Sequence, residues 1–588
     1  MIRAAALASL MLALSSTARA DVEYQLDLGE REAHRATVEM IVRGAPSPLE
    51  LAMPVWTPGA YEVRTWGRNV TLLGAADGAG RALSARRTGA STFRVEGHAA
   101  GSEVRVRYRV FAAVLSDDGS QIDNNHAYLN GTSIFLQARG QERARHRVAP
   151  GVPAGWRAAS ALDETPSGGF EAFGYEALVD APIELGRFAI AEVRAAGRSY
   201  RVAVDGLPEV PPMLLRDVAA LAEAEARMVG APPYARYLLL IHLADGIGRL
   251  AALEHAASAS IIVPHRSLQS GASEHYEELL YVVAHELFHA WNARRLRPAE
   301  LVPYDLSRPT PSRSLWITEG LTEYYAHRAM HLAGRWSRAR YLERLGDEST
   351  RAVNAARRGL TLEDEAELAF QPSDEAAADP DAYYARGHLV ALALDASIRA
   401  ATDGKRTLDD AVKALLAEAD RAGGIVAVDG AVLAKEIARL AGDATAERVA
   451  AWTRSADEPP RMAEALSGLG LKLAIEEGPA RTVAGFAADS DGGSLRVAAV
   501  SPNGPAAHAG LRTGDRIVLI DGVAPSRKWA ETLAGRSPGA AVALEAVRAT
   551  RRLLLELRLE ARRAVSCRVS ETPAPPKVAL RRDAWLAR

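Results

Sequence analysis

The chain has very little cysteine: Cys567 is the only one among its 588 residues. A single cysteine excludes an intramolecular disulfide, so the fold must rest on its apolar cores and on any metal that it binds. Basic and acidic side chains nearly cancel, with 71 Lys and Arg against 73 Asp and Glu. Bulk charge therefore indicates neither a nucleic-acid partner nor binding to an acidic membrane surface.

Long apolar runs are also missing. No segment reaches the roughly 18 uninterrupted apolar residues that a membrane-spanning helix needs. The amino terminus instead carries Arg3, a short apolar run and an A-x-A pattern that ends at Ala20. This order predicts a secretory signal peptide over residues 1–20, cleaved before Asp21. We therefore expect a bacterial periplasmic or secreted protein that has no membrane span.

Length and patterning predict several domains, since about 150 residues per domain is typical. Period-two alternation, broken by Gly, Pro and Asp-Gly turns, predicts an antiparallel β domain over 21–198. Residues 199–455 open with a strand-like run and then become rich in Ala, Leu and Glu, which predicts a mainly helical domain. A third domain over 460–561 and a basic tail over 562–588, expected to be loose, complete the chain.

The strongest chemical signal is an H-E-x-x-H motif inside the apolar helical segment Val283–Asn292. Residues four apart share one face of a helix, so His285 and His289 can bind one metal ion, for which zinc is the natural choice. Glu286 lies one step round the helix, where its carboxylate can take a proton from a water molecule at the metal. These residues predict a metallopeptidase with one catalytic zinc ion.

A catalytic zinc site needs a third protein ligand and an open position. Glu319 is the main candidate, because its neighbours are apolar and Gly320 permits close helix packing. Glu323, one helical turn further on, is the alternative: it could be the ligand, a partner of a zinc-bound histidine, or a solvated side chain. Other histidines show no competing ligand spacing, and we expect them to be structural: His242, His255, His265, His275, His327 and His388.

These motifs resemble a known family. H-E-x-x-H followed by W-x-x-E-G-x-x-x-Y is similar to the gluzincin metallopeptidases, and H-E-L-F-H-A-W-N is similar to the M61 (glycyl aminopeptidase) family among them. The segment Met53–Tyr61 resembles the amino-terminal region of that family. The resemblance implies a thermolysin-like α+β peptidase domain over 199–455, with Glu319 as the third zinc ligand.

Two more segments match the family pattern. Leu253-Glu254-His255 resembles the G-L-E-H segment, which implies that Glu254 binds the free amino group of the substrate. Asp381–Gly387 resembles the Y-x-K-G segment, which implies that Tyr384 donates a hydrogen bond to the tetrahedral oxyanion. From the residues alone, Glu254 could also be a surface glutamate paired to an arginine, and Tyr384 a helix-packing aromatic.

The chain departs from the family pattern at two places. Ala251 and Ala252 replace the usual Gly-Gly before L-E-H, which reshapes the expected substrate-binding pocket. Arg386 replaces the usual Lys, which keeps the charge but changes its geometry. Neither change removes a catalytic atom. The resemblance thus implies an aminopeptidase that acts on peptides with a free amino terminus and removes small residues, Gly or Ala.

The segment Ser501–Ile517, followed by Ile520-Asp521-Gly522, resembles a PDZ domain of the bacterial protease type. The resemblance implies a groove in which backbone N–H groups bind the carboxylate of a peptide's C-terminus. We expect this carboxylate loop at Gly468, Leu469, Gly470 and Leu471. A PDZ domain that only packs against the peptidase domain and binds nothing is the alternative.

Two other functions fit the same motifs. One is a periplasmic endopeptidase whose PDZ domain captures exposed C-termini, and a blocked amino terminus separates it from an aminopeptidase. The other is a non-catalytic PDZ adaptor that keeps zinc for folding, which would need neither Glu286 nor Tyr384.

Overall fold

The computed structural model describes residues 21–245, 250–271, 273–357, 359–370, 381–455, 458–491, 493–501, 504–526 and 528–587. The predicted signal peptide, residues 1–20, and positions 502 and 503 of the PDZ motif lie outside the described residues. Contacts divide the chain into two compact units. Among the described residues, the N-terminal unit comprises those of 21–54, 65–115 and 119–186, and the C-terminal unit comprises those of 55–64, 116–118 and 187–587.

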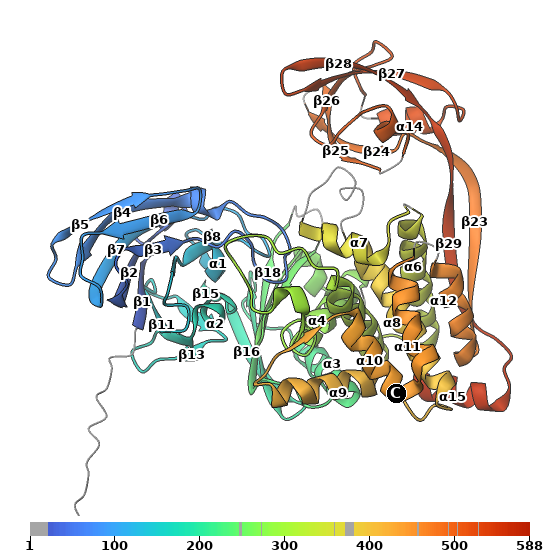
Figure 1. Ribbon diagram of the computed structural model, residues 1–588, viewed down its shortest axis with the longest axis horizontal. Coiled ribbons are helices and arrows are strands. Elements are labelled where there is room, and N and C mark those ends of the chain that lie inside the picture. Colours follow the sequence, from blue (N-terminus) through green and yellow to red (C-terminus); the bar gives the residue numbers. More distant parts are fainter. Residues whose placement is uncertain are drawn as a thin grey trace, which may run out of the picture. The chain divides into compact units, whose positions relative to one another are not determined.

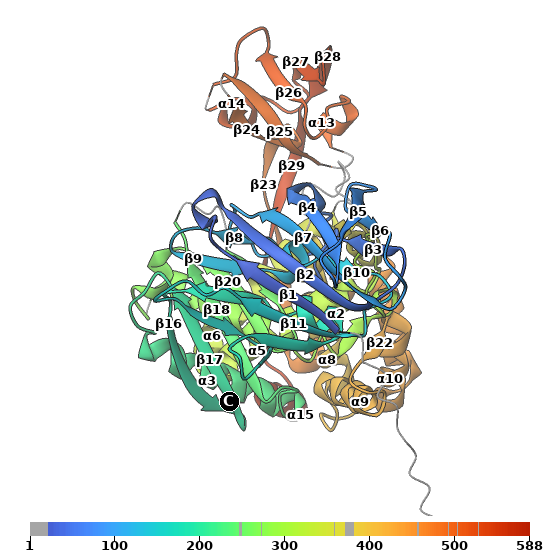
Figure 2. The same cartoon turned by 90° about the vertical axis from the view of Figure 1, so that its left-hand side faces the viewer.

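The N-terminal unit is rich in β-strands, as the alternating sequence predicts. In chain order they are β1 (Asp21–Asp27), β2 (Arg35–Ala45), β3 (Leu49–Ala52), β4 (Val70–Asp77), β5 (Ala82–Arg87), β6 (Thr92–Glu96), β7 (Ser102–Phe111), β8 (Gln121–Ile122), β9 (His126–Leu129), β10 (Gln137–Ala138), β11 (Arg145–Pro150), β12 (Arg157–Ser160), β13 (Asp163–Glu164), β14 (Phe170–Phe173) and β15 (Ile183–Gly186). The 11-stranded sheet has the order β10-β3-β6-β5-β4-β7-β2-β1-β11-β14-β13, and the 4-stranded sheet has the order β12-β15-β9-β8 (Figure 2). In β7, Val104, Val106 and Tyr108 are buried while Arg105 and Arg107 are exposed, which is the expected period of two.

A 5-stranded mixed sheet begins the long C-terminal part of the chain. Its strands, in spatial order, are β16 (Ala189–Ala195), β17 (Arg198–Asp205), β18 (Arg236–Leu243), β20 (Ser258–Val263) and β19 (Ala251–Glu254). β17, β18 and β20 run parallel, whereas β19 is an edge strand antiparallel to β20. The boundary predicted after residue 198 falls at the start of β17, which pairs with β16 along its whole length. Both strands therefore belong to one sheet.

α3 (Pro212–Val229) joins β17 to β18 of this sheet, and helices make up most of the chain between the sheet and the PDZ region (Figure 1). The latter are α4 (Glu274–Phe288), α5 (Leu321–Leu332), α6 (Arg338–Ala356), α7 (Leu362–Glu367), α8 (Ala382–Ala401), α9 (Leu408–Arg421), α10 (Gly430–Ala441), α11 (Asp443–Thr453) and α12 (Glu458–Leu466). α8 is buried along most of its length and contacts α5 and α6, so it is the central helix of this region. In the part of the chain that the structure describes, no helix has the length and hydropathy needed to cross a membrane.

The PDZ region is a small sheet with its own core. β24 (Phe486–Asp491), β25 (Ser494–Val500), β26 (Arg516–Ile520), β27 (Ala541–Arg548) and β28 (Arg551–Arg558) pair in that order, with the short helices α13 (Pro505–His508) and α14 (Trp529–Ala534). The core includes Leu495, Ile517 and Leu544. Two long antiparallel strands, β23 (Leu471–Val483) and β29 (Glu560–Glu571), flank this sheet in the sequence (Figure 1).

The C-terminal tail is folded, contrary to the expectation of a loose segment. β29 packs on α6, where Asn354 Nδ2 donates a hydrogen bond to Val565 O at 2.9 Å. After β29, α15 (Pro576–Leu586) buries Trp585, whose indole N–H donates to Tyr324 Oη at 3.2 Å. The burial of this large aromatic side chain explains why a basic, Pro-bearing tail becomes ordered.

Candidate active site

α4 brings the two histidines of the H-E-x-x-H motif together. The helix starts after Ser273, whose side chain accepts a hydrogen bond from Tyr276 N. It ends at Phe288, before the apolar segment does, and His289 is its C-cap with helical dihedral angles. The ring centroids of His285 and His289 lie 4.6 Å apart, so the spacing of four residues survives the early end of the helix.

Glu319 completes a group of three buried donors. It lies in a π-helical turn, Trp316–Gly320, that leads into α5. Its Oε2 is 3.4 Å from His285 Nε2 and 3.3 Å from His289 Nε2. The three side chains are buried, and their donor atoms all lie within 4.8 Å of one another. Two imidazoles and a carboxylate that converge in this way fit a zinc ion and leave room for a further ligand.

Each histidine uses its other ring nitrogen to contact a neighbour. His289 Nδ1 lies 3.2 Å from Asn292 O, and His285 Nδ1 lies 3.3 Å from Glu323 Oε1. These contacts orient both Nε2 atoms toward Glu319, as partners of metal-binding histidines commonly do. The geometry thus favours Glu319 over Glu323 as the third donor and gives Glu323 the place of a partner to His285.

Asn292 holds the π-helical turn in place. Its Nδ2 donates hydrogen bonds to Ile317 O at 2.9 Å, Thr318 O at 2.8 Å and Thr322 Oγ1 at 3.0 Å. A π-helical turn leaves carbonyl groups without their usual helical partners, and this amide supplies a donor to two of them. The last residue of the H-E-L-F-H-A-W-N motif therefore fixes the segment that carries Glu319.

A cavity of about 240 Å³ opens beside these residues. Its lining includes Glu286 and Tyr384, the two predicted catalytic residues, together with Ala251, Ala252 and His285. Tyr384 is half-buried on α8, and its ring centroid lies 6.0 Å from that of His285. With Glu323, which also lines it, six of the residues singled out in the sequence meet around one space.

Glu254 lies next to the same group but is buried at the end of β19. The carboxylates of Glu254 and Glu286 and the imidazole of His289 form a second set of donor atoms, all within 4.8 Å of one another. Arg294 Nη2 is 3.5 Å from Glu254 Oε1 and also donates to the backbone oxygens of Glu254 and Pro58. Glu254 is only 4% exposed, which excludes the alternative that it is a surface glutamate.

The electrostatics of the site follow from burial and proximity. Burial alone would lower the pKa of His289, but the carboxylates of Glu319 and Glu254 outweigh it and raise this pKa to about 9. Burial alone would raise the pKa of Glu319, but the two imidazoles lower it to about 2. Burial raises the pKa of Glu286 well above its usual value, and the carboxylate of Glu254 adds to this effect. Glu319 is therefore ionised, and a cation bound here would displace the proton of His289.

Arg386, the departure from the family pattern on α8, does not line the cavity. Its Nη1 is 2.9 Å from Glu365 Oε2 and donates to Leu360 O at 2.8 Å. This arginine is buried and anchors α8 to the segment around α7. The replacement of Lys by Arg thus concerns packing behind the site.

The predicted PDZ carboxylate loop lies elsewhere than the groove of the PDZ region. Gly468 and Leu469 belong to a 3-10 turn, Ser467–Leu469, and Leu471 is the first residue of β23. Gly470 O accepts hydrogen bonds from Thr572 N, just after β29, at 2.9 Å and from Arg582 Nη1 of α15 at 3.3 Å, so the segment packs against the C-terminal tail. The groove, of about 340 Å³, is lined by residues that include Val483, Ala484, Gly485, Phe486, Trp529 and Leu533.

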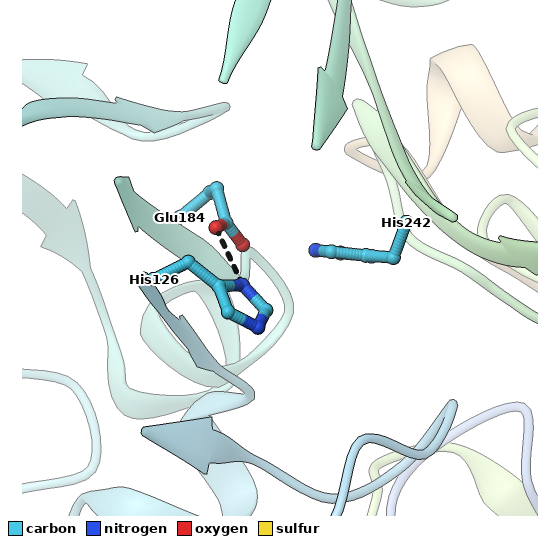
Figure 3. A group of neighbouring side chains, drawn as sticks. All are labelled: His126, Glu184 and His242. Atoms are coloured by element: carbon cyan, nitrogen blue, oxygen red, sulfur yellow. Dashed lines mark hydrogen bonds and ion pairs between the residues drawn. The ribbon is translucent and has the colours of Figure 1, made fainter. Parts of the chain in front are cut away.

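A separate His–Glu pair in the N-terminal unit has an ordinary structural explanation. His126 Nδ1 lies 3.0 Å from Glu184 Oε1 (Figure 3). His126 Nε2 lies 3.0 Å from Gln121 Oε1. Both ring nitrogens are engaged, and the contacts join β8, β9 and β15 of one sheet.

Sequence reasoning missed several residues that shape the site. Gly59 lies against the carboxylate of Glu254, and Tyr61 is close enough to Glu319 and Glu254 that their charges raise its pKa further, beyond the effect of burial. Arg294 follows the motif closely in the sequence, but no pattern there links it to Glu254, which it contacts. The Met53–Tyr61 segment was visible as a resemblance, but no spacing in the sequence connects it to Glu254, about two hundred residues later.

Comparisons with known proteins agree with these observations. The model of the peptidase M61 N-terminal domain matches residues 23–187, that of M61 glycyl aminopeptidase matches residues 278–390, and that of a PDZ domain matches residues 496–532. No curated protein matches the chain.

Among solved structures, the chain is similar to an aminopeptidase N family protein from Idiomarina loihiensis, with 24% identity, a TM-score of 0.79, and 96% of this chain and 100% of that chain covered. It also resembles an M1 zinc metallopeptidase from Deinococcus radiodurans, with 16% identity, a TM-score of 0.43, and 74% and 93% covered. The first likeness establishes a shared fold. The family matches show that the chain is a peptidase with an M61-type N-terminal domain, an M61-type catalytic segment and a PDZ domain.

Proposed function

We propose that the protein is a zinc-dependent aminopeptidase with a thermolysin-like catalytic domain. The observation that carries this proposal is the convergence of His285, His289 and Glu319 beside a cavity that Glu286 and Tyr384 line. Zinc held by these three residues supplies Lewis acidity, which activates water and polarises the peptide carbonyl. Export to the periplasm through the predicted signal peptide is part of the proposal.

Glu286 is the proton carrier of the proposed reaction. Its carboxylate takes a proton from the attacking water and passes it to the nitrogen of the leaving amine. Its raised pKa, caused by burial, brings its affinity for a proton closer to what such a transfer needs. Tyr384 donates its hydroxyl hydrogen to the oxyanion, and burial raises the pKa of this phenol, which keeps it protonated.

Glu254 limits the reaction to peptides with a free amino terminus. Its carboxylate pairs with the ammonium group of the substrate, so the first peptide bond reaches the catalytic group and bonds further along do not. Burial raises the pKa of Glu254, and Arg294, which contacts the same carboxylate, opposes this shift as the ammonium group of a substrate would. Ala251 and Ala252 at the rim of the cavity leave space for a small first side chain, Gly or Ala.

The PDZ groove is the proposed site for a C-terminal peptide. The segment Val483–Phe486 leads into β24, which is an edge strand of the sheet, and lines the groove together with α14. A peptide can add to this edge as a further strand. Phe486 and Trp529 stack with their ring centroids 4.8 Å apart and form an apolar wall. This groove could present chains to an endopeptidase, which makes that activity the rival to test.

A matched pair of peptides tests the proposal. We expect the zinc-loaded protein to remove one residue from an Ala-initiated peptide, detected by mass spectrometry, and to leave the N-acetylated form intact. Glu286→Gln should lower the rate by about 10²- to 10⁴-fold, because it removes the proton carrier. Glu278→Gln, an exposed glutamate on the same helix, should not change it. Internal cleavage of both peptides would instead support the endopeptidase, and cleavage that is unaffected by Glu286→Gln would contradict the assigned site.

A further inference from the structure

The polar side chains of the active site continue one helical turn further into the protein. On three helical segments, polar residues recur at intervals of four, which places them on one face of each helix. Two of the helices, α5 and α8, contact each other, and α4 contacts α5. The recurring residues are Tyr281, His285 and His289 at α4, Glu319, Glu323 and His327 along α5, and Tyr384 and His388 on α8.

Glu323, His327 and His388 form a second buried group of metal-binding side chains. Their exposed fractions are 7%, 2% and 1%, and one donor atom from each lies within 4.8 Å of the others. The two imidazole rings have centroids 4.4 Å apart. The group consists of two histidines and one carboxylate, which is the donor set of the first site repeated one turn away.

Several donor atoms of this group lack partners among the residues that the structure describes. Neither ring nitrogen of His388 has a hydrogen-bond partner there, and neither does Glu323 Oε2. His327 Nδ1 lies 2.8 Å from Glu323 O, so this ring nitrogen has a backbone contact. A buried polar group without a partner destabilises a fold, so several such atoms in one place need an explanation.

Glu323 lies between the two groups. Its Oε1 is 3.3 Å from His285 Nδ1, and its Oε2 is 3.8 Å from His327 Nδ1. One carboxylate therefore faces a histidine of each group. Its second oxygen is available to the deeper group without loss of the contact to His285.

The charge state of the histidines suits a cation. Burial lowers the pKa of His327 to about 3 and that of His388 well below its usual value, so both rings are neutral and have a free lone pair. Arg351 lowers both pKa values further, and Arg344 lowers that of His327. Each arginine contacts a carboxylate: Arg344 Nη2 is 2.9 Å from Glu277 Oε1, and Arg351 Nη1 is 3.1 Å from Glu348 Oε2. Their positive charges are thus partly balanced.

We propose that Glu323, His327 and His388 form a second site for a divalent transition-metal ion, distinct from the catalytic site and joined to it through the carboxylate of Glu323. Two imidazoles and one carboxylate select Zn²⁺, Co²⁺ or Ni²⁺ over Mg²⁺ and Ca²⁺, which prefer oxygen ligands alone. Two of the three residues, His327 and His388, are histidines that we expected to be structural, and the inference does not depend on the aminopeptidase reaction.

Metal stoichiometry tests this site. The full chain and its variants are dialysed against buffered Zn²⁺, and the bound metal per chain is measured by inductively coupled plasma mass spectrometry. We expect His388→Phe to hold one equivalent less than the wild type, because the apolar ring removes both nitrogens. His146→Phe is the matched control: it replaces another buried histidine without a described hydrogen-bond partner, in the N-terminal unit, and should leave the stoichiometry unchanged. Equal metal content in the wild type and His388→Phe at every Zn²⁺ concentration would overturn the proposal.

A second ligand variant separates this inference from the proposed function. His289→Gln should lose the equivalent that His388→Phe keeps. If only His289→Gln lost metal, the catalytic site would stand and the second site would fail. If only His388→Phe lost metal, the reverse would hold. If His388→Phe does not fold, the wild type is titrated with Co²⁺ and followed by visible absorption. Two successive spectral changes would support two metal sites, and a single binding step would rule out the second site.

Discussion

The glutamate carboxylates of this site differ in pKa and in contacts because their neighbours differ. Glu319 lies between two imidazoles and has a lowered pKa, whereas Glu286 lines the cavity and has a raised pKa. Glu254 is held by Arg294 at the end of an edge strand. The same residue type can thus bind a cation, carry a proton or hold an ammonium group, according to whether burial or nearby charge dominates.

The role of Glu254 leads to a prediction at this scale. Glu254→Gln should lower kcat/KM for an Ala-initiated peptide by about 100-fold, because truncating one partner of a buried charge pair costs about 2–5 kcal/mol. Steady-state kinetics on that peptide and on its analogue without the amino group measure the effect. The analogue is the control, since it lacks the group that Glu254 is proposed to bind. An equal loss on both substrates would mean that Glu254 supports only the structure.

At the scale of elements, two glycines let the segments of the site approach closely. A Cβ at Gly387 on α8 would lie 2.7 Å from Trp316 O and 2.8 Å from Gly320 Cα. A Cβ at Gly320 would overlap the backbone of Gly387 in the same way. This contact sets the separation between the turn that carries Glu319 and the helix that carries Tyr384. The sequence predicts close helix packing at Gly320, and the structure shows that its partner in this contact is Gly387.

Gly387→Ala should therefore push these two segments apart. We expect a loss of about 1–3 kcal/mol in the free energy of unfolding, the usual cost of overpacking, and a lower kcat because Tyr384 moves relative to Glu319. Urea unfolding and kinetics check both effects. Gly430→Ala is the matched helical control, since the atoms nearest to its new Cβ lie 3.8–4.0 Å away. Wild-type values for Gly387→Ala would show that the contact is not critical.

At the scale of the whole molecule, the division into units does not follow the order of the chain. Residues 55–64 lie in sequence between strands of the N-terminal unit but belong by their contacts to the C-terminal unit. Val55 N donates to Leu306 O at 2.9 Å, and Trp56 Nε1 donates to Asp305 O at 2.8 Å. The segment then brings Gly59 against Glu254, so an early part of the chain covers the proposed amine site.

Gly59→Ala tests the importance of this segment. Gly59 has φ of +102°, and a Cβ there would overlap the carboxylate of Glu254. We expect a loss of kcat/KM of at least about 10-fold, from displacement of that carboxylate. Gly80→Ala is the control in kinetic assays, because it has φ of +84° and no atom within 4 Å of its new Cβ. Equal effects of the two variants would attribute the loss to backbone strain alone.

The sequence by itself determined the chemistry of this protein and the kind of its elements. Spacing of four on a helix placed His285 and His289 on one face, and the cost of burying a carboxylate in an apolar helix pointed to Glu319. Alternation of period two predicted the strands of the N-terminal unit. These features are local, so they can be read within a few turns of the chain.

Only the tertiary structure decided which distant segments meet. The approach of Gly59 and Arg294 to Glu254, the contact of Gly320 with Gly387, and the joining of Glu323 to His327 and His388 all involve side chains on separate elements. The position of the PDZ groove at Val483–Phe486 and the docking of Trp585 depended likewise on which surfaces were left to pack. Such contacts depend on the packing of the complete chain, and the local pattern around each residue carries no record of its distant partner.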